Sequence, residues 1–304
     1  MAISRAQLVK ELEPGLNALF GLEYKRYDNQ HAEIYTNESS DRAFEEEVML
    51  SGFANANVKV EGSGVNYDQS QETYTARYTH DTIALAFAIT EEAIEDNLYD
   101  KISSRYTKAL ARSMSNAKQV KAAAPLNNGL PTVDGFDSGD GVSLFNTSHT
   151  TVSGTAVSNT LSTQADLNET SLEQALIDIA AFTDERGLRV AAKGMKMIIP
   201  SANQFAAERL LKSQGRTGTA DNDINAVVSM GMIPQGYRVN HFLTDSDSWY
   251  LITDVPNGMK HFQRTPLSTA MEGDFDTGNV RYKARERYVF GVSDFRGIFG
   301  VEGA

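Results

Sequence analysis

A helical pattern about 31 residues long, over residues 90–121, constrains the fold of this chain more than any other feature. At 1.5 Å per residue such a helix spans ~47 Å, far more than the average helix of a globular protein. Thr90 fits the N-cap position, and we expect Pro125, followed by Asn128-Gly129, to end the helix. Apolar side chains at spacings of three and four predict its buried core: Ile94, Leu98, Ile102, Tyr106, Leu110 and Met114.

A polar β-hairpin is predicted before this helix, over residues 57–80. Val58 to Val60 and Thr73 to Thr79 have strand propensity, and flexible polar residues lie between them. A two-stranded ribbon without an apolar face is marginally stable alone, so we expect it to take its contacts from another chain. The candidate contact residues are Lys59, Glu61, Tyr67, Tyr74, Arg77 and Tyr78.

The rest of the chain divides by composition. Residues 1–26 predict an amphipathic helical arm broken at Pro14-Gly15, and a polar connector follows up to Glu47. The alternation of Ile83, Leu85, Phe87 and Ile89 with small residues predicts a strand that enters a core. Because the apolar stripe of residues 90–121 is not a strict heptad, we expect one helix packed on a sheet and no coiled coil.

The C-terminal half alternates helices and strands. Residues 126–170 are predicted loops, and residues 171–255 predict a compact α/β unit opened by a Thr170–Glu173 capping box. Strands return in residues 256–304, where the strand over 280–287 carries a basic face. A polar loop in the α/β unit is a further candidate site: Gly215, Arg216 and Gly218.

Several functional classes are disfavoured. The net charge of −12 argues against a protein that binds DNA through phosphates, and the absence of cysteine excludes disulfides and thiol catalysis. No long apolar run predicts a membrane span. The histidines lack metal-binding spacing, and no nucleophile or nucleotide-binding motif is present, so we expect no catalytic residue, cofactor or metal. Three acidic residues are close in sequence without calcium-loop spacing: Asp134, Asp137 and Asp140.

The order of these parts resembles the major capsid proteins of tailed bacteriophages, which have the Hong Kong ninety-seven type fold. Two segments are similar to Mu-like major head subunits: Phe87-Ala88-Ile89-Thr90-Glu91-Glu92-Ala93-Ile94-Glu95-Asp96-Asn97, and Gly141-Val142-Ser143-Leu144-Phe145 followed by Ser148-His149. The resemblance implies an α+β fold. Its parts would be an N-arm (1–50), an extended E-loop hairpin (51–89), a peripheral-domain spine helix (90–125), a mainly axial domain (126–255) and returning peripheral strands (256–304).

The resemblance also implies a function. We expect a non-enzymatic shell subunit that assembles in the host cytoplasm into hexamers and pentamers of the icosahedral head around double-stranded DNA. A portal protein, a decoration protein and a separate scaffolding protein are expected partners, the last because the chain starts almost at the arm. Some relatives crosslink an E-loop lysine to an asparagine of a neighbour, but Lys59 lies near the predicted hairpin base, so we expect no crosslink. The alternatives are an encapsulin-like nanocompartment shell, an enzyme and a tail tube protein.

Overall fold

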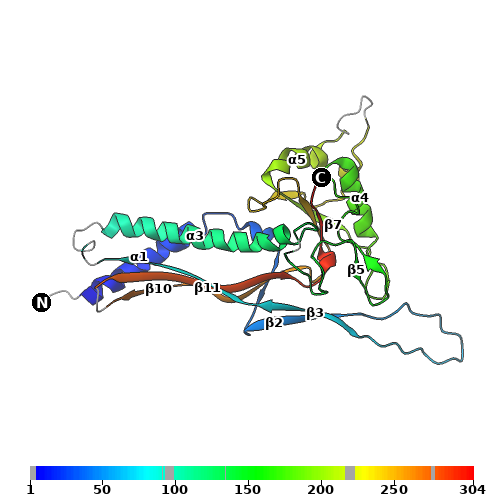
Figure 1. Cartoon of the computed structure of the whole chain (residues 1–304), viewed down its shortest axis with the longest axis horizontal. Helices are drawn as coiled ribbons and strands as arrows, with labels where there is room; N and C mark the ends of the chain where they lie inside the picture. The colour runs from blue at the N-terminus through cyan, green and yellow to red at the C-terminus, as the bar shows by residue number, and fades with distance from the viewer. Residues whose placement is uncertain (1–4, 91, 93–98, 134, 216–222, 275–277) are drawn as a thin grey trace.

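The computed structural model describes residues 5–90, 92, 99–133, 135–215, 223–274 and 278–304. A long four-stranded sheet runs through its elongated part (Figure 1), in the order β1 (Thr36–Ser39), β10 (Met259–Gly273), β11 (Val280–Val292) and β4 (Asp81–Ile89). Strands β10, β11 and β4 are antiparallel, and β1 pairs with β10 in parallel. Along β11 buried and exposed side chains alternate, as the sequence pattern predicts.

Two helices cover one face of this sheet, α1 (Arg5–Tyr24) and α3 (Tyr99–Asn128). The contact is apolar, with Leu16 and Phe20 of α1 packed among Leu110 and Met114 of α3 and Tyr282 of β11. The very long helix is confirmed from Tyr99 onward.

The predicted break at Pro14-Gly15 and the predicted stop at Pro125 are wrong, whereas the end of α3 at Asn128 agrees with the predicted Asn128-Gly129 signal. Helix α1 continues through Pro14, and α3 continues past Pro125 to Asn128. Proline disfavours a helix interior because it lacks an N–H and crowds the preceding turn, but tertiary packing overrides this preference here. Leu126, which follows Pro125, is fully buried in the core below α3.

A hairpin projects from the other face of the sheet, but its strands differ from the prediction. Strand β3 (Glu72–Thr79) pairs with β2 (Phe44–Leu50). Strand β2 begins inside the segment predicted to be a polar connector, which ended at Glu47. The predicted strand at Val58 to Val60 is wrong, because residues 51–60 and 63–71 have no regular secondary structure. Val58 and Val60 have strand propensity, but a β-strand also needs a partner strand with which to form hydrogen bonds.

A second sheet lies at the opposite end from the N-terminus (Figure 1), in the order β12 (Ile298–Val301), β9 (Trp249–Thr253), β7 (Gly194–Ile199) and β8 (Tyr237–Val239). Its helices are α4 (Glu169–Ala180), α5 (Gln204–Lys212) and α6 (Ala226–Met230). Short elements complete the described chain: β5 (His149–Thr150), β6 (Ala156–Val157), and 3₁₀ turns at Gln30–Glu33, Ser201–Asn203 and Phe295–Gly297.

The predicted capping box of α4 is also corrected. The reciprocal pair is Asn168 and Ser171, because the Asn168 side chain accepts from Ser171 N and the Ser171 hydroxyl accepts from Asn168 N. Thr170 lies inside the helix. No described helix is long and apolar enough to cross a lipid bilayer.

Candidate assembly interface

The protruding hairpin ends in a segment that we call the hairpin loop, residues 51–71 (Figure 1). Its large apolar side chains face solvent, and Tyr67 and Val58 are 97% and 96% exposed. Soluble proteins rarely display such a group of apolar side chains without a partner. The exposed members are Phe53, Val58, Val60, Val65 and Tyr67.

The two ends of the hairpin loop are held together by hydrogen bonds. Ser51 N donates to Gln71 O at 2.9 Å, and Asp68 Oδ2 accepts from Ala54 N at 2.7 Å. The backbone donors of Ala54 and Gln69 lower the pKa of Asp68. Arg186, beyond α4, donates to Gln69 O and its Nη2 lies 3.9 Å from Asp68 Oδ1. The loop therefore leaves the protein from a fixed base.

The base of the hairpin belongs to the subunit's own core, which corrects the prediction that residues 57–80 lack an apolar face. Tyr78 is 3% exposed and its hydroxyl bonds to the Ser293 hydroxyl, while Tyr74 Oη donates to Ser293 O at 3.3 Å. Burial raises the pKa of Tyr78. The Tyr78 and Phe262 rings pack against each other with 4.9 Å between their centroids. The predicted intersubunit role is therefore wrong for Tyr78, and the hydroxyl of Tyr74 is used within the chain.

The other predicted contact residues lie on the surface. Lys59, Glu61 and Tyr67 belong to the hairpin loop, and all three are exposed. The predicted place of Lys59 near the hairpin base is wrong, because it lies close to the turn at Glu61-Gly62, at the middle of the loop. Arg77 is paired inside the subunit, with its guanidinium 4.1 Å from the Phe44 ring centroid and its Nε 3.6 Å from a Glu46 carboxylate oxygen.

The predicted helix core is described only in part. Leu110 and Met114 are buried, as predicted. Tyr106 was predicted on the same buried stripe, but its side chain is 51% exposed, so this prediction is wrong. Ile94 and Leu98 lie outside the described residues, as does the side chain of Ile102. The buried stripe includes polar residues that the apolar pattern did not identify: Ser103, Thr107, Ser115, Lys118 and Gln119.

The predicted loop of the α/β unit is also partly described. Gly215 forms an isolated bridge with Ile224, while Arg216 and Gly218 lie outside the described residues.

Asp140 forms hydrogen bonds inside the subunit with His149 and Ser138. His149 Nδ1 lies 2.6 Å from Asp140 Oδ2, and the His149 ring stacks on Phe295 at 3.8 Å. Burial opposes ionisation of Asp140, but the hydrogen bonds from His149 and Ser138 outweigh it and lower its pKa. Among the described residues no acidic or histidine cluster fits a metal ion, and Asp134 lies outside them.

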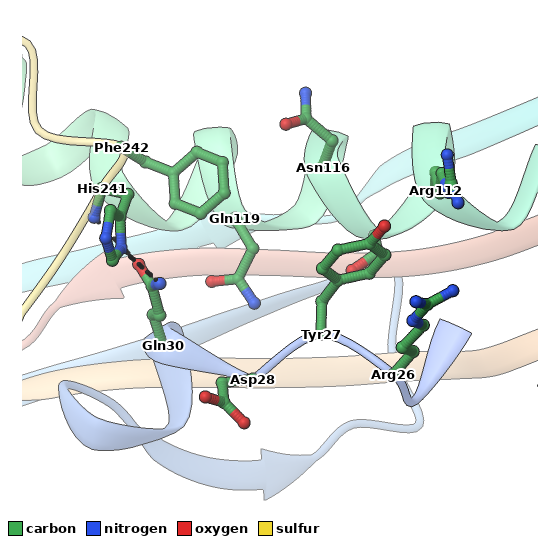
Figure 2. A pocket seen from close by; sticks show the side chains of 10 residues that line it. Arg26, Tyr27, Asp28, Gln30, Arg112, Asn116, Gln119, His241 and Phe242 are labelled. Carbon is green, nitrogen blue, oxygen red and sulfur yellow. Dashed lines mark hydrogen bonds between the residues drawn. The ribbon is translucent and has the colours of Figure 1, made fainter. Parts of the chain in front are cut away.

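A cavity of about 480 Å³ lies between α3, residues 26–30 and residues 241–242 (Figure 2). Three of its lining side chains, those of Gln30, His241 and Arg112, make hydrogen bonds within the subunit. Gln30 Nε2 lies 2.8 Å from His241 Nδ1, and Arg112 Nε donates to Glu23 Oε1 at 2.8 Å. These contacts connect the N-terminal segment to α3 and to the loop that follows β8.

An ion cluster lies where the long strands enter the second sheet. Arg296 is almost fully buried, with Nη2 2.7 Å from Glu185 Oε1 and Nη1 3.2 Å from Asp294 Oδ1. Its Nε donates to Thr183 O at 2.8 Å. Separating Arg296 from these partners would leave a buried charge unpaired, which is unfavourable. The cluster therefore holds the segment after β11 against the segment after α4, which contains Thr183 and Glu185.

Comparison with known proteins places this architecture. The profile of a family described as phage capsid protein matches residues 73–301. No curated protein sequence matches the chain. The fold is similar to the capsid of an empty GTA particle, with a TM-score of 0.59, 14% identity, and coverage of 92% of this chain and 91% of that chain.

Two further solved structures have the same fold. The virus-like particle from Pyrococcus furiosus gives a TM-score of 0.52 at 11% identity, covering 95% of this chain and 98% of that one. The procapsid of bacteriophage JBD30 gives a TM-score of 0.50 at 14% identity, covering 99% and 77%. The α+β capsid fold expected from the sequence is therefore confirmed, and the chain belongs to the phage capsid protein family, as a major capsid protein of the icosahedral shell of a virion.

Proposed function

We propose that this subunit assembles into hexamers and pentamers by laying its hairpin loop across a neighbouring subunit, and that the closed shell encloses double-stranded DNA. The observation that carries the proposal is the exposure of Val58, Val65 and Tyr67 on a loop with a fixed base. Burying each aliphatic side chain of this kind stabilises by about 1.5–3 kcal/mol. The assembled shell gains this free energy, whereas the free subunit leaves the side chains in water.

The domain roles are part of the same proposal. The part built on α1, α3, β10 and β11 would be the peripheral domain, and the second sheet with α4 and α5 would be the axial domain near the capsomer centre. The bridge between Gly215 and Ile224 would then lie toward the symmetry axis. A hairpin loop laid on a different surface of a neighbour would make a heterologous interface, which closes into a ring when the rotation between subunits is right.

We further propose a purely structural role, with no catalytic step. Portal, decoration and scaffolding proteins are proposed partners, and membership of the family is the support for them. A place among the Mu-like head proteins is also a proposal. A nanocompartment shell remains the alternative. Purified particles distinguish the two, since a phage head contains double-stranded DNA and a nanocompartment contains a protein cargo.

Removing the hairpin loop tests the proposal. Ser51 and Gln71 are hydrogen-bonded neighbours, so residues 52–70 can be replaced by Asn-Gly, which suits a two-residue hairpin turn. The shortened subunit should keep most of its thermal stability, because Tyr78 and the pairing of β2 with β3 are unchanged and only the surface contacts of Asp68 and Gln69 with Arg186 are lost. It should form no shells. Electron microscopy and sedimentation measure assembly. Normal shells from the shortened chain would refute the role of the loop.

A further inference from the structure

A buried histidine closes the joint at which the hairpin leaves the long sheet. His80 separates β3 from β4, and Ser40 lies between β1 and β2. The Ser40 hydroxyl lies 2.8 Å from His80 Nε2, so the two strands of the hairpin are hydrogen-bonded to each other at this joint. Both residues are buried, with exposed fractions of 4% for Ser40 and 6% for His80.

The other ring nitrogen of His80 has no partner. The Ser40 hydroxyl donates its proton to Glu45 Oε1 at 2.7 Å, so His80 Nε2 supplies the proton of its contact with Ser40. His80 Nδ1 is buried and forms no hydrogen bond within the described residues. Buried polar atoms of native proteins are nearly always hydrogen-bonded, because an unpaired one is unfavourable. The Nδ1 side of the ring is therefore a position at which a ligand can bind.

Two arginines lie around the His80 ring. Burial lowers the pKa of His80, and the positive charge of Arg287 lowers it further. Glu45 raises this pKa through its negative charge, and Arg264 lowers it slightly. Charges that shift a pKa in this way are close to the group. The strand register agrees, because Arg287 is opposite Thr82, two residues beyond His80.

The positive charges at this joint exceed the negative ones. Arg287 Nε is buried without a partner, and the Arg287 guanidinium forms no ion pair within the described part of the chain. Arg264 Nη1 donates to Ser40 O at 3.4 Å and lies 3.6 Å from Asp41, whose carboxylate is fully exposed and screened by solvent. The half-buried Glu45 is thus the main counter-charge to two guanidinium groups.

We propose that this joint binds a phosphate-like oxyanion between His80 Nδ1, Arg287 and Arg264. We call these three residues the oxyanion site. Guanidinium groups match the oxygens of such anions with pairs of N–H donors, and hydrogen bonds between ionised groups are the stronger class. A protonated His80 would donate from both ring nitrogens, to Ser40 and to the anion. The inference does not depend on the proposed role of the hairpin loop.

A water molecule is the simplest alternative occupant, and the charges disfavour it. Water would give His80 Nδ1 a partner but would leave Arg287 without a counter-charge. A doubly charged oxyanion supplies both, and its oxygens can reach donors on β10, on β11 and at the joint between β3 and β4. The net charge of −12 repels anions from the chain as a whole, so binding requires donors that converge at one place.

An occupied site would stiffen the joint of the hairpin. The anion would connect His80, which lies between two strands, to Arg264 of β10 and Arg287 of β11. Local opening of the backbone at residues 79–82 would then break these contacts as well. Amide hydrogen exchange of residues 79–82 should therefore slow when the site is filled.

Histidine NMR of unassembled subunits in sulfate tests the site directly. Sulfate does not titrate near neutral pH, so any pH dependence of its binding belongs to the protein. Sodium sulfate is titrated against sodium chloride at constant ionic strength, which separates binding from screening. Sulfate should shift the His80 ring signals saturably and raise the pKa of His80, and it should bind about tenfold more tightly when His80 is protonated. His80→Gln identifies the signals.

A variant of one arginine tests the assigned donors. Arg287→Gln should abolish the saturable shift and leave the subunit folded, because its guanidinium has no ion-pair partner in the described chain. Lys283→Gln, at an exposed cation of the same strand, is the matched control and should bind sulfate as the parent chain does. Thermal melts report folding, and Arg264→Gln gives the same test if Arg287→Gln does not fold.

Three results would overturn the inference. They are no saturable shift of His80, an equal shift in chloride at the same ionic strength, and an equal loss of binding in Lys283→Gln and Arg287→Gln. A short DNA duplex then identifies the source of the oxyanion. A duplex that competes with sulfate at His80 supports a backbone phosphate as the occupant, and sulfate binding that the duplex does not affect supports a free ion.

Discussion

Lys118 and Glu286 form an ion pair inside the protein, with 3.2 Å between Nζ and Oε2 and side chains that are 10% and 0% exposed. The pair connects the middle of α3 to β11. Tyr24 of α1 donates to the other Glu286 oxygen at 3.1 Å, so three elements meet at one carboxylate. The cost of burying both charges is offset by contacts that only the complete sheet and helix layer provides.

Removing one charge of this pair should destabilise the subunit strongly. Lys118→Ala leaves Glu286 buried and unpaired, which should lower the free energy of unfolding by about 3–5 kcal/mol in urea titrations. Lys118→Met with Glu286→Leu should cost much less, because neither charge is then buried. Lys212→Ala, which breaks an exposed pair with Glu208, should change the free energy of unfolding little, because solvent screens this pair. Equal losses for Lys118→Ala and Lys212→Ala would contradict this account.

The helix core predicts a graded effect of truncation. Leu110→Ala should lower the free energy of unfolding by about 2–5 kcal/mol, because Leu110 is buried against α1 and the sheet. Tyr106→Ala is the comparison on the same helix, and its half-exposed ring should make the loss smaller. Chemical denaturation of unassembled subunits measures both, and a larger loss for Tyr106→Ala would reverse the assigned faces.

Gly291 permits the hairpin base to pack on the sheet. A Cβ at this position would overlap the Tyr78 ring, whereas a Cβ at Gly273, on the other long strand, would meet no atom within 4 Å. Gly291→Ala should therefore cost about 1–3 kcal/mol by overpacking, and Gly273→Ala should change stability little. Thermal melts of both variants check this, and an unchanged midpoint for Gly291→Ala would show that the contact is loose.

Two buried histidines predict acid sensitivity. Burial and the nearby Lys118 ammonium lower the pKa of His31 to about 4 and that of His261 to about 3, from an ordinary value near 6.5. As the pH falls, the two histidines bind protons in the unfolded chain before they do so in the folded protein, which favours unfolding. The contribution of these two histidines to the free energy of unfolding should therefore be fully present above pH 6.5. As the pH drops toward 4, each histidine should lower the free energy of unfolding by up to about 1.4 kcal/mol per pH unit.

Substitution isolates this pH effect. His31→Gln with His261→Gln should flatten the slope of unfolding free energy between pH 6.5 and 4.5, whatever it does to absolute stability. His241→Gln, at an exposed histidine, should leave the slope unchanged. Identical slopes for the two variants would assign the acid sensitivity to carboxylates instead.

No covalent bond is expected between subunits of the shell. Lys59 is the lysine of the hairpin loop, and the proposed assembly requires only non-covalent packing of this loop on a neighbour. Mature particles boiled in detergent should give one band near the chain mass of 33.3 kDa. A ladder of multimers would show a crosslink, and Lys59→Arg would test whether this lysine forms it.

The order of elements was readable from local patterns. The alternation along Val280, Tyr282 and Ala284 predicts β11, and the spacing of Leu110 and Met114 predicts the buried side of α3. These signals are local, because a strand repeats every two residues and a helix every 3.6. They were enough to identify the family, whose parts differ from one another in length and periodicity.

Tertiary structure decided what the local patterns could not. Glu45-Glu46-Glu47 has the composition of a solvated connector, yet strand β2 forms there. Its backbone pairs with β3, and the Lys260 ammonium forms an ion pair with Glu47. In sequence Lys118 is indistinguishable from a surface cation, and only the fold brings Glu286, 168 positions away, beside it. The sequence alone determined which segments form most of the helices and strands, through periodicity and propensity. Pairing, burial of charge and the continuation of α3 through Pro125 were decided by the fold, since those energies come from residues distant in the chain.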